Sequence, residues 1–278
     1  MLAAAVVSVS VATLWKQPGV VRPLDAPALS NPADPAAWSQ NLATTADRVW
    51  LDSHVQTQAL YGEQVAVLAR RGAWTKVAVL DQPDPQDAHG YPGWLPTKQL
   101  SFAPFDASGT QAVVLARTAR LHVRGRTIEL SYGTRLPLVR PGVVRTPDGV
   151  GAVSGVSTPL PFSARSLVAQ ARRFLGVHYL WGGLSAWGFD CSGLIWDVYR
   201  AHGMTIPRDA DPQFRAGRPV ARNALRAGDL LFFGSPSYVE HVAIYVGGGR
   251  MLEAPDSAHR VRIVPVRWTY FVGARRFG

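Results

Sequence analysis

The sequence has a single cysteine, Cys191, and no apolar run long enough to cross a membrane. A lone cysteine excludes a disulfide scaffold and argues against a thiolate-rich metal site. A membrane-spanning helix needs about 18 to 20 consecutive apolar residues. We therefore expect no cofactor, no bound metal and no membrane span.

Charged residues are also scarce, at 17% of the chain, and one sign dominates: the net charge is +10, mostly from arginine. A basic surface can attract nucleic acid, a membrane surface or an anionic polymer such as cell wall. The arginines are scattered rather than gathered on one helix, and no zinc-finger or helix-turn-helix pattern is present. We expect no nucleic-acid partner, and a GC-rich genome accounts for the arginine equally well.

The first fourteen residues are mostly apolar but lack the positively charged start of a signal peptide. Val7, Val9 and Val11 alternate with small residues, as they would in a strand. The sequence as written predicts a cytoplasmic protein. A start further upstream would instead place it in the cell envelope or outside the cell.

The N-terminal third reads as short strands separated by turn residues, with one helix over Ala36–Asp47. A chain of 278 residues has room for two or three domains. We assign residues 1–105 to a first small β-barrel. Its expected strands are Val6–Leu14, Val55–Leu60, Gln64–Ala69, Thr75–Leu80 and Gly93–Pro96.

Residues 108–158 look like a weaker second copy, because Gly133 and its neighbours repeat the pattern around Gly62. A Pro-rich linker, Thr158–Pro161, precedes a third domain over 161–278. That domain begins with a helix after Ser163 and continues into strands, which predicts an α+β fold. The strands expected in the second copy are Val113–Ala116, Leu121–Val123, Thr127–Leu130 and Arg135–Arg140.

Cys191 lies in the segment Gly188–Gly193, directly before a helical pattern of apolar residues. Asp190 is a good N-cap residue, so Cys191 falls in the first helical turn. Free N–H groups and the helix dipole stabilise an anion there, which favours the reactive thiolate. On this segment alone, a nucleophile and a small buried apolar residue are equally good interpretations.

A cysteine nucleophile needs a base, and His241 opens an apolar strand that runs into three glycines. If the hairpin turns at Gly247, His241 faces Glu253 across the strands, where a carboxylate could orient the imidazole. An ordinary surface pair is the alternative. Asp256 and His259 are further candidates for the orienting group.

Four motifs in order resemble the signature of NlpC-type cell-wall cysteine peptidases: Tyr179–Gly183, Gly188–Gly193, Gly228–Phe233 and His241–Gly247. The resemblance implies a papain-like core that hydrolyses peptidoglycan stem peptides. It makes Cys191 the nucleophile and His241 the base. Glu253 then stands where the family most often has histidine.

The same resemblance assigns the Tyr179 hydroxyl to the oxyanion, with core packing as the alternative. The Cys191 N–H is a second possible donor. Arg208 matches a further family segment and could pair with Asp190 at the pocket wall, or could lie at the surface. We expect the substrate to be bound by Trp181, Asp190, Ser192 and Arg208.

Three segments, Leu60–Val65, Gly72–Val77 and Gly90–Leu95, resemble bacterial SH3-like domains. SH3-like barrels before this catalytic domain look like the γ-D-glutamyl-L-diamino acid endopeptidases. The resemblance implies that Glu63 and Tyr91 bind the free amine of L-Ala-γ-D-Glu-L-diamino acid peptides, in murein peptide recycling. A solvated turn residue is the alternative for Glu63.

We expect such an enzyme to work as a monomer. Two alternatives remain open at this point. One is a secreted autolysin that cuts intact peptidoglycan, and the other is a non-catalytic protein that binds the cell wall.

Overall fold

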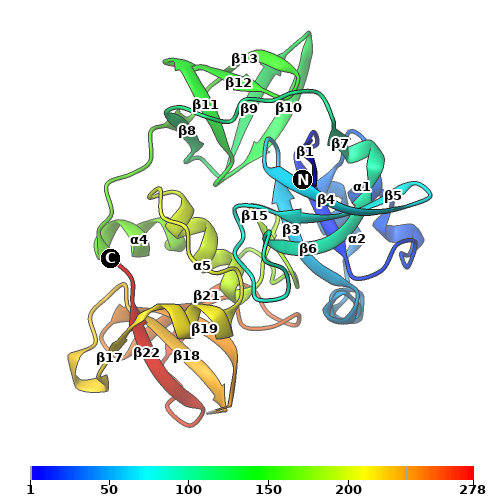
Figure 1. Cartoon of the computed structure of the whole chain (residues 1–278). Helices are drawn as coiled ribbons and strands as arrows, with labels where there is room; N and C mark the ends of the chain where they lie inside the picture. The colour runs from blue at the N-terminus through cyan, green and yellow to red at the C-terminus, as the bar shows by residue number, and fades with distance from the viewer. Residues whose placement is uncertain (1, 236) are drawn as a thin grey trace.

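The computed structural model describes residues 2–235 and 237–278. Its elements form three groups, which we call the first β-unit, the second β-unit and the catalytic unit (Figure 1). Each group has its own main sheet, of seven, seven and six strands in chain order, and the catalytic unit also holds a two-stranded sheet. This arrangement agrees with the expected fold class, an α+β unit preceded by small β-units.

The first β-unit forms a sheet of order β3-β2-β6-β5-β4-β1-β7. Short helices connect β2 to β3. The strands are β1 (Ala3–Val7), β2 (Val11–Trp15), β3 (Val55–Leu60), β4 (Gln64–Arg71), β5 (Trp74–Val79), β6 (Tyr91–Pro96) and β7 (Leu100–Ser101). The helices are η1 (Pro23–Asp25), α1 (Ala26–Leu29), α2 (Pro35–Asn41), α3 (Thr45–Trp50), η2 (Leu51–Ser53) and η3 (Thr97–Gln99).

Two of the predicted elements were wrong in this unit. The expected strand Val6–Leu14 is divided between β1 and β2, because the chain bends after Val7 and pairs its two halves with different strands. The expected helix Ala36–Asp47 is divided between α2 and α3. A new helix begins there because Thr44 and Asp47 form a reciprocal capping box.

The second β-unit forms a sheet of order β10-β9-β13-β12-β11-β8-β14. Adding seven to every strand number of the first sheet gives this order, so the two units share one topology. Its strands are β8 (Gln111–Val114), β9 (Thr118–Val123), β10 (Arg126–Ser131), β11 (Arg135–Arg140), β12 (Val143–Thr146), β13 (Gly149–Val153) and β14 (Val156–Ser157).

The catalytic unit places helices against a sheet of order β17-β22-β18-β19-β20-β21. The helices are α4 (Ala164–Arg172), α5 (Cys191–Arg200), α6 (Ala210–Ala216) and η4 (Arg222–Ala224). The strands are β15 (Leu184–Ser185), β16 (Gly188–Phe189), β17 (Arg218–Val220), β18 (Leu230–Ser235), β19 (Tyr238–Gly247), β20 (Arg250–Glu253), β21 (Arg262–Pro265) and β22 (Phe271–Arg276).

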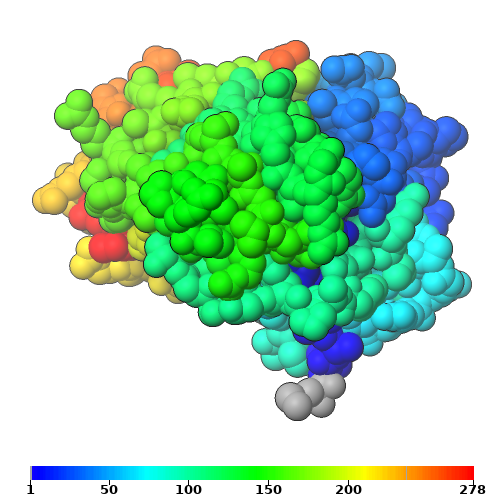
Figure 2. Space-filling model, turned by 90° about the horizontal axis from the view of Figure 1, so that it is seen from above, coloured from blue at the N-terminus to red at the C-terminus, as the bar shows by residue number. Residues whose placement is uncertain are grey.

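The three units pack against one another around α5 (Figure 1). Arg200 on this helix forms ion pairs with Glu63 and Asp81 of the first β-unit and donates to the Gly133 carbonyl of the second. Figure 2 shows the second β-unit, in green, in front of the other two. The main apolar core also includes Tyr132 from the second unit.

No helix in the described part of the chain is long and apolar enough to cross a membrane.

Candidate active site

Cys191 is the first residue of α5, and Asp190 caps this helix. The Asp190 carboxylate accepts a hydrogen bond from the Gly193 N–H at 2.6 Å, as the sequence predicted for an N-cap residue. The capping carboxylate therefore binds the N–H of Gly193 and not that of Cys191. The thiol therefore lies at a helix N-terminus, where a negative charge on sulfur or on a nearby oxygen is stabilised.

The hairpin of β19 and β20 brings His241 and Glu253 together, but in a register that differs from the predicted one. Ile244 pairs with Leu252, two residues away from the expected alignment, and a bulge precedes Gly247. Because side chains alternate with a period of two, this shift keeps His241 and Glu253 on the same face of the sheet. They meet diagonally instead of directly.

The imidazole of His241 donates from Nε2 to the Glu253 carboxylate at 2.9 Å. Nδ1 is therefore the nitrogen left for the thiol of Cys191. Burial disfavours the charged imidazolium, but hydrogen bonds to Cys191 and Glu253 and their negative charge outweigh it. Together they raise the pKa of His241 to about 9.

Two arginines hold Glu253 in place, and the sequence analysis missed both. Arg267 binds the carboxylate with both Nη atoms, at 2.7 and 2.6 Å, and Arg262 donates from Nε at 3.1 Å. Burial opposes ionisation of Glu253, yet the hydrogen bonds from Arg267 and His241 hold its pKa well below the ordinary value. The carboxylate is thus kept charged and oriented.

A cleft of about 300 Å³ runs past Cys191, between the catalytic unit and the first β-unit. Tyr179, Trp181, Asp190 and Ser192 line it. Tyr179 is almost buried, and this desolvation, together with the charge of Cys191, raises the pKa of its phenol well above the ordinary value. Tyr179 therefore keeps its proton and can donate it in a hydrogen bond into the cleft.

Arg208 pairs with Asp190 at 2.8 Å and donates to the Ser192 hydroxyl at 3.0 Å. It also donates to the Thr57 hydroxyl of the first β-unit at 3.0 Å. Its side chain is fully buried and does not line the cleft. The expected role in substrate contact is therefore corrected: Arg208 supports the cleft wall from behind.

The structure also corrects the role predicted for Glu63. This side chain is buried, forms an ion pair with Arg200 at 3.0 Å, and borders a separate cavity that does not include Cys191. It is buried because the Tyr61–Gly62 turn packs against the neighbouring units. Glu63 therefore lies outside the cleft.

Tyr91 does line the cleft, and its hydroxyl donates to the Asp209 carboxylate at 2.8 Å. Asp84 and Asp209 are carboxylates of the cleft that the sequence analysis did not select. Burial raises the pKa of both, that of Asp209 to about 6 although Arg208 opposes the shift. Asp209 directly follows Arg208, within the segment that matched the family. Its position beside Arg208 could have identified Asp209 as a residue of the site.

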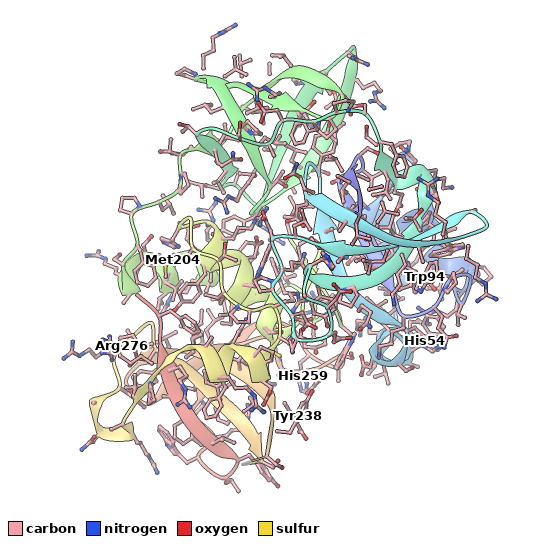
Figure 3. All side chains as sticks on the ribbon, in the orientation of Figure 1. His54, Trp94, Met204, Tyr238, His259 and Arg276 are labelled. Atoms are coloured by element: carbon pink, nitrogen blue, oxygen red, sulfur yellow. The ribbon has the colours of Figure 1, made fainter. Side chains whose placement is uncertain are left out.

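Asp256 and His259, the other candidates for orienting His241, instead pair with each other at 2.6 Å in an exposed loop. In Figure 3 His259 and Tyr238 lie on the side of the catalytic unit that faces the first β-unit. Tyr238 lines the cleft, whereas His259 does not.

Comparison with known proteins agrees with this arrangement. Residues 176–275 match the model of the NlpC/P60 family, and residues 51–100 match that of the bacterial dipeptidyl-peptidase SH3 domain. The gamma-D-glutamyl-L-lysine dipeptidyl-peptidase of Bacillus cereus is 37% identical, over 98% of this chain and 90% of that protein. The chain belongs to the NlpC/P60 family. It is therefore a cysteine peptidase, and the expected family is confirmed.

Two further relatives extend the similarity over nearly the whole chain. The protein of the same name from Bacillus subtilis is 36% identical, over 94% of this chain and 93% of its own. A crystal structure of an NlpC/P60 family protein from Bacillus cereus covers 98% of this chain and 99% of its own, with a TM-score of 0.91 at 36% identity. The similarity therefore includes both β-units as well as the catalytic unit.

Proposed function

We propose that this enzyme hydrolyses the amide between γ-D-glutamate and an L-diamino acid in short peptides with a free N-terminal L-alanine. The names of the two full-length relatives support this reaction type. The peptides have the composition of peptidoglycan stem peptides, so the reaction belongs to murein peptide recycling.

The acidic end of the cleft is the observation that carries the proposal. Asp84 and Asp209 lie there beside the hydroxyl of Tyr91, and the first β-unit contributes part of the wall. Carboxylates whose ionisation is disfavoured by burial gain stability when a cation binds. The ammonium of an N-terminal alanine is such a cation.

An acylated amine would bring no positive charge to Asp84 or Asp209, and Asp209 would keep only its longer contact with Arg208, at 3.7 Å, among the described residues. A buried polar group that loses its partner costs about 1 to 3 kcal/mol, and more when it is charged. The cleft would therefore select peptides whose N-terminus is free and reject intact cell wall, in which the alanine is acylated.

We assign the chemical steps to the residues around Cys191. The thiolate of Cys191 attacks the γ-carbonyl carbon, while the Tyr179 hydroxyl and the Cys191 N–H bind the oxyanion. The imidazolium of His241 gives its Nδ1 proton to the leaving amine as the C–N bond breaks. Water then attacks the thioester, His241 accepts its proton, and L-Ala-D-Glu is released.

A paired-substrate assay tests the proposal. We expect L-Ala-γ-D-Glu-L-Lys to be cleaved at least 100-fold faster, by kcat/KM, than its N-acetyl form, and Cys191→Ala to abolish both activities. Cleavage at another bond, or substantial turnover by Cys191→Ala, would reject the assignment. Digestion of purified sacculi at a comparable rate would favour an autolysin instead.

A further inference from the structure

Another cavity, of about 630 Å³, lies beside His241, which does not line the acidic cleft. His241, Arg262, Arg267, Glu240 and Asp256 are among its lining residues, and Glu240 also lines the cleft. Because Glu240 lines both spaces, the two adjoin, and a peptide with its N-terminus in the cleft would place its leaving residue in the space beside His241. We call this cavity the leaving-side pocket.

The leaving-side pocket carries charged groups of both signs, with Arg262 and Arg267 beside Glu240 and Asp256. One buried carboxylate, Glu253, faces two guanidinium groups. Arg267 uses both Nη atoms on Glu253, whereas Arg262 uses only Nε. Among residues 2–235 and 237–278, no hydrogen bond from Nη1 or Nη2 of Arg262 is formed, and about a third of this side chain is exposed.

Glu253 fixes the position of Arg262 relative to the reacting atoms. His241 holds Oε2 of this carboxylate at 2.9 Å, and Arg262 holds Oε1 at 3.1 Å. The guanidinium of Arg262 and the imidazole that protonates the leaving amine therefore contact the two oxygens of one carboxylate. A planar pair of N–H groups in this position matches a carboxylate.

We propose that Arg262 is a specificity-determining residue that binds a carboxylate of the leaving diamino acid; this inference rests on the proposed function. The α-carboxylate of a C-terminal lysine and the side-chain carboxylate of diaminopimelate share the required chemistry. Glu240 is exposed, forms no ion pair in the described part of the chain, and is placed to bind the second ammonium of either residue.

Four substrates test the inference: L-Ala-γ-D-Glu-L-Lys, its C-terminal amide, the meso-diaminopimelate tripeptide, and the γ-linked aminomethylcoumarin derivative of L-Ala-D-Glu. We expect the lysine acid to exceed its amide by about tenfold or more in kcat/KM, mainly through KM. In Arg262→Gln this ratio falls toward one, and Arg262→Lys restores part of it. Diaminopimelate amidated only at its α-carboxylate distinguishes the two carboxylates.

Two controls separate binding from effects on the catalytic residues. Arg218→Gln changes an exposed arginine on β17 and leaves all rates unchanged. The pH profile of Cys191 alkylation by iodoacetamide reports on the thiolate and imidazolium without any peptide. We expect Arg262→Gln to shift this profile far less than it changes the acid-to-amide ratio.

The outcomes also separate the inference from the proposed function. Equal cleavage of acid and amide by the unmodified enzyme, or an equal loss on all substrates in Arg262→Gln, overturns the role of Arg262 alone. If Cys191 is alkylated normally but no γ-D-glutamyl substrate is cleaved, the proposed function falls and the inference falls with it.

Discussion

The two β-units share one strand order, and each contains a Tyr-Gly turn between corresponding strands. Tyr61–Gly62 joins β3 to β4, and Tyr132–Gly133 joins β10 to β11. Tyr61 belongs to the apolar core of the second β-unit, whereas Tyr132 belongs to the core of the catalytic unit. Each turn thus packs into the unit that follows it in the chain.

The two units differ in what they offer to the substrate. The first contributes Lys16, Gln56, Asp84 and Tyr91 to the cleft, and the second contributes no lining residue to it in the described part of the chain. The same strand topology therefore lines the cleft in the first β-unit and supports the catalytic unit in the second. We expect changes in the first unit to alter substrate selection, and changes in the second to alter stability.

The largest expected effect comes from alanine at Gly133. Its φ is +79°, and a Cβ there would lie 1.6 Å from Oδ1 of the buried Asp197. Overpacking and left-handed strain together cost about 3 kcal/mol or more. Urea denaturation of Gly133→Ala should show this loss in the free energy of unfolding.

The corresponding change in the first unit is the matched control. A Cβ at Gly62 would meet the end of the Leu136 side chain at 2.6 Å, which can move, so we expect Gly62→Ala to lose less stability. Equal losses in the free energy of unfolding at the two glycines would contradict the view that the Tyr132–Gly133 turn is the more tightly packed of the two. KM of the surviving folded enzyme should not change.

The next effect concerns the acidic end of the cleft. Asp209→Asn removes a carboxylate that we assign to the substrate ammonium, so kcat/KM for the free tripeptide should fall about tenfold to hundredfold. The N-acetyl peptide should lose much less. Asp106→Asn, at an exposed carboxylate that pairs with Arg145 in the second unit, is the control and should change neither value.

A smaller effect is expected from pH. Burial raises the pKa of Asp209 to about 6, so its charge is lost below that pH. The peptide amine loses its proton above about 8. The ratio of free to acetylated kcat/KM should therefore be largest between these values and fall by about tenfold per unit below the lower one. A ratio independent of pH from 5 to 7 would exclude Asp209 as the counter-charge.

The smallest effect distinguishes the two tyrosines. The Tyr61 hydroxyl donates to Asp148 at 2.7 Å, so Tyr61→Phe should lose about 1 kcal/mol of stability. The Tyr132 hydroxyl is buried without a partner among the described residues, so Tyr132→Phe should be neutral or stabilising. Thermal unfolding of the pair measures the difference, and the reverse order would contradict the comparison.

Much of the fold could be predicted because it follows from local patterns. Asp190 as N-cap, the β19–β20 hairpin and the repeated glycine pattern at Gly62 and Gly133 are local features. The strand order and the bend after Val7 depend on which strands pair over long distances. No local pattern contains that information.

The site residues that lie in short sequence motifs could be predicted. Those whose role depends on packing between distant segments could not. Cys191 and His241 lie in ordered motifs. Glu63 was assigned to the substrate amine by resemblance alone, whereas packing against other units buries it away from the cleft. Arg267 clamps Glu253 from fourteen residues away, a contact that only the folded sheet creates.

The most direct test of the central claim compares two peptides on the unmodified enzyme. The acidic end of the cleft predicts that L-Ala-γ-D-Glu-L-Lys is cleaved at the γ-D-glutamyl amide with a kcat/KM at least 100-fold above that of its N-acetyl form, at about pH 7. Equal kcat/KM values for the two peptides would contradict the account.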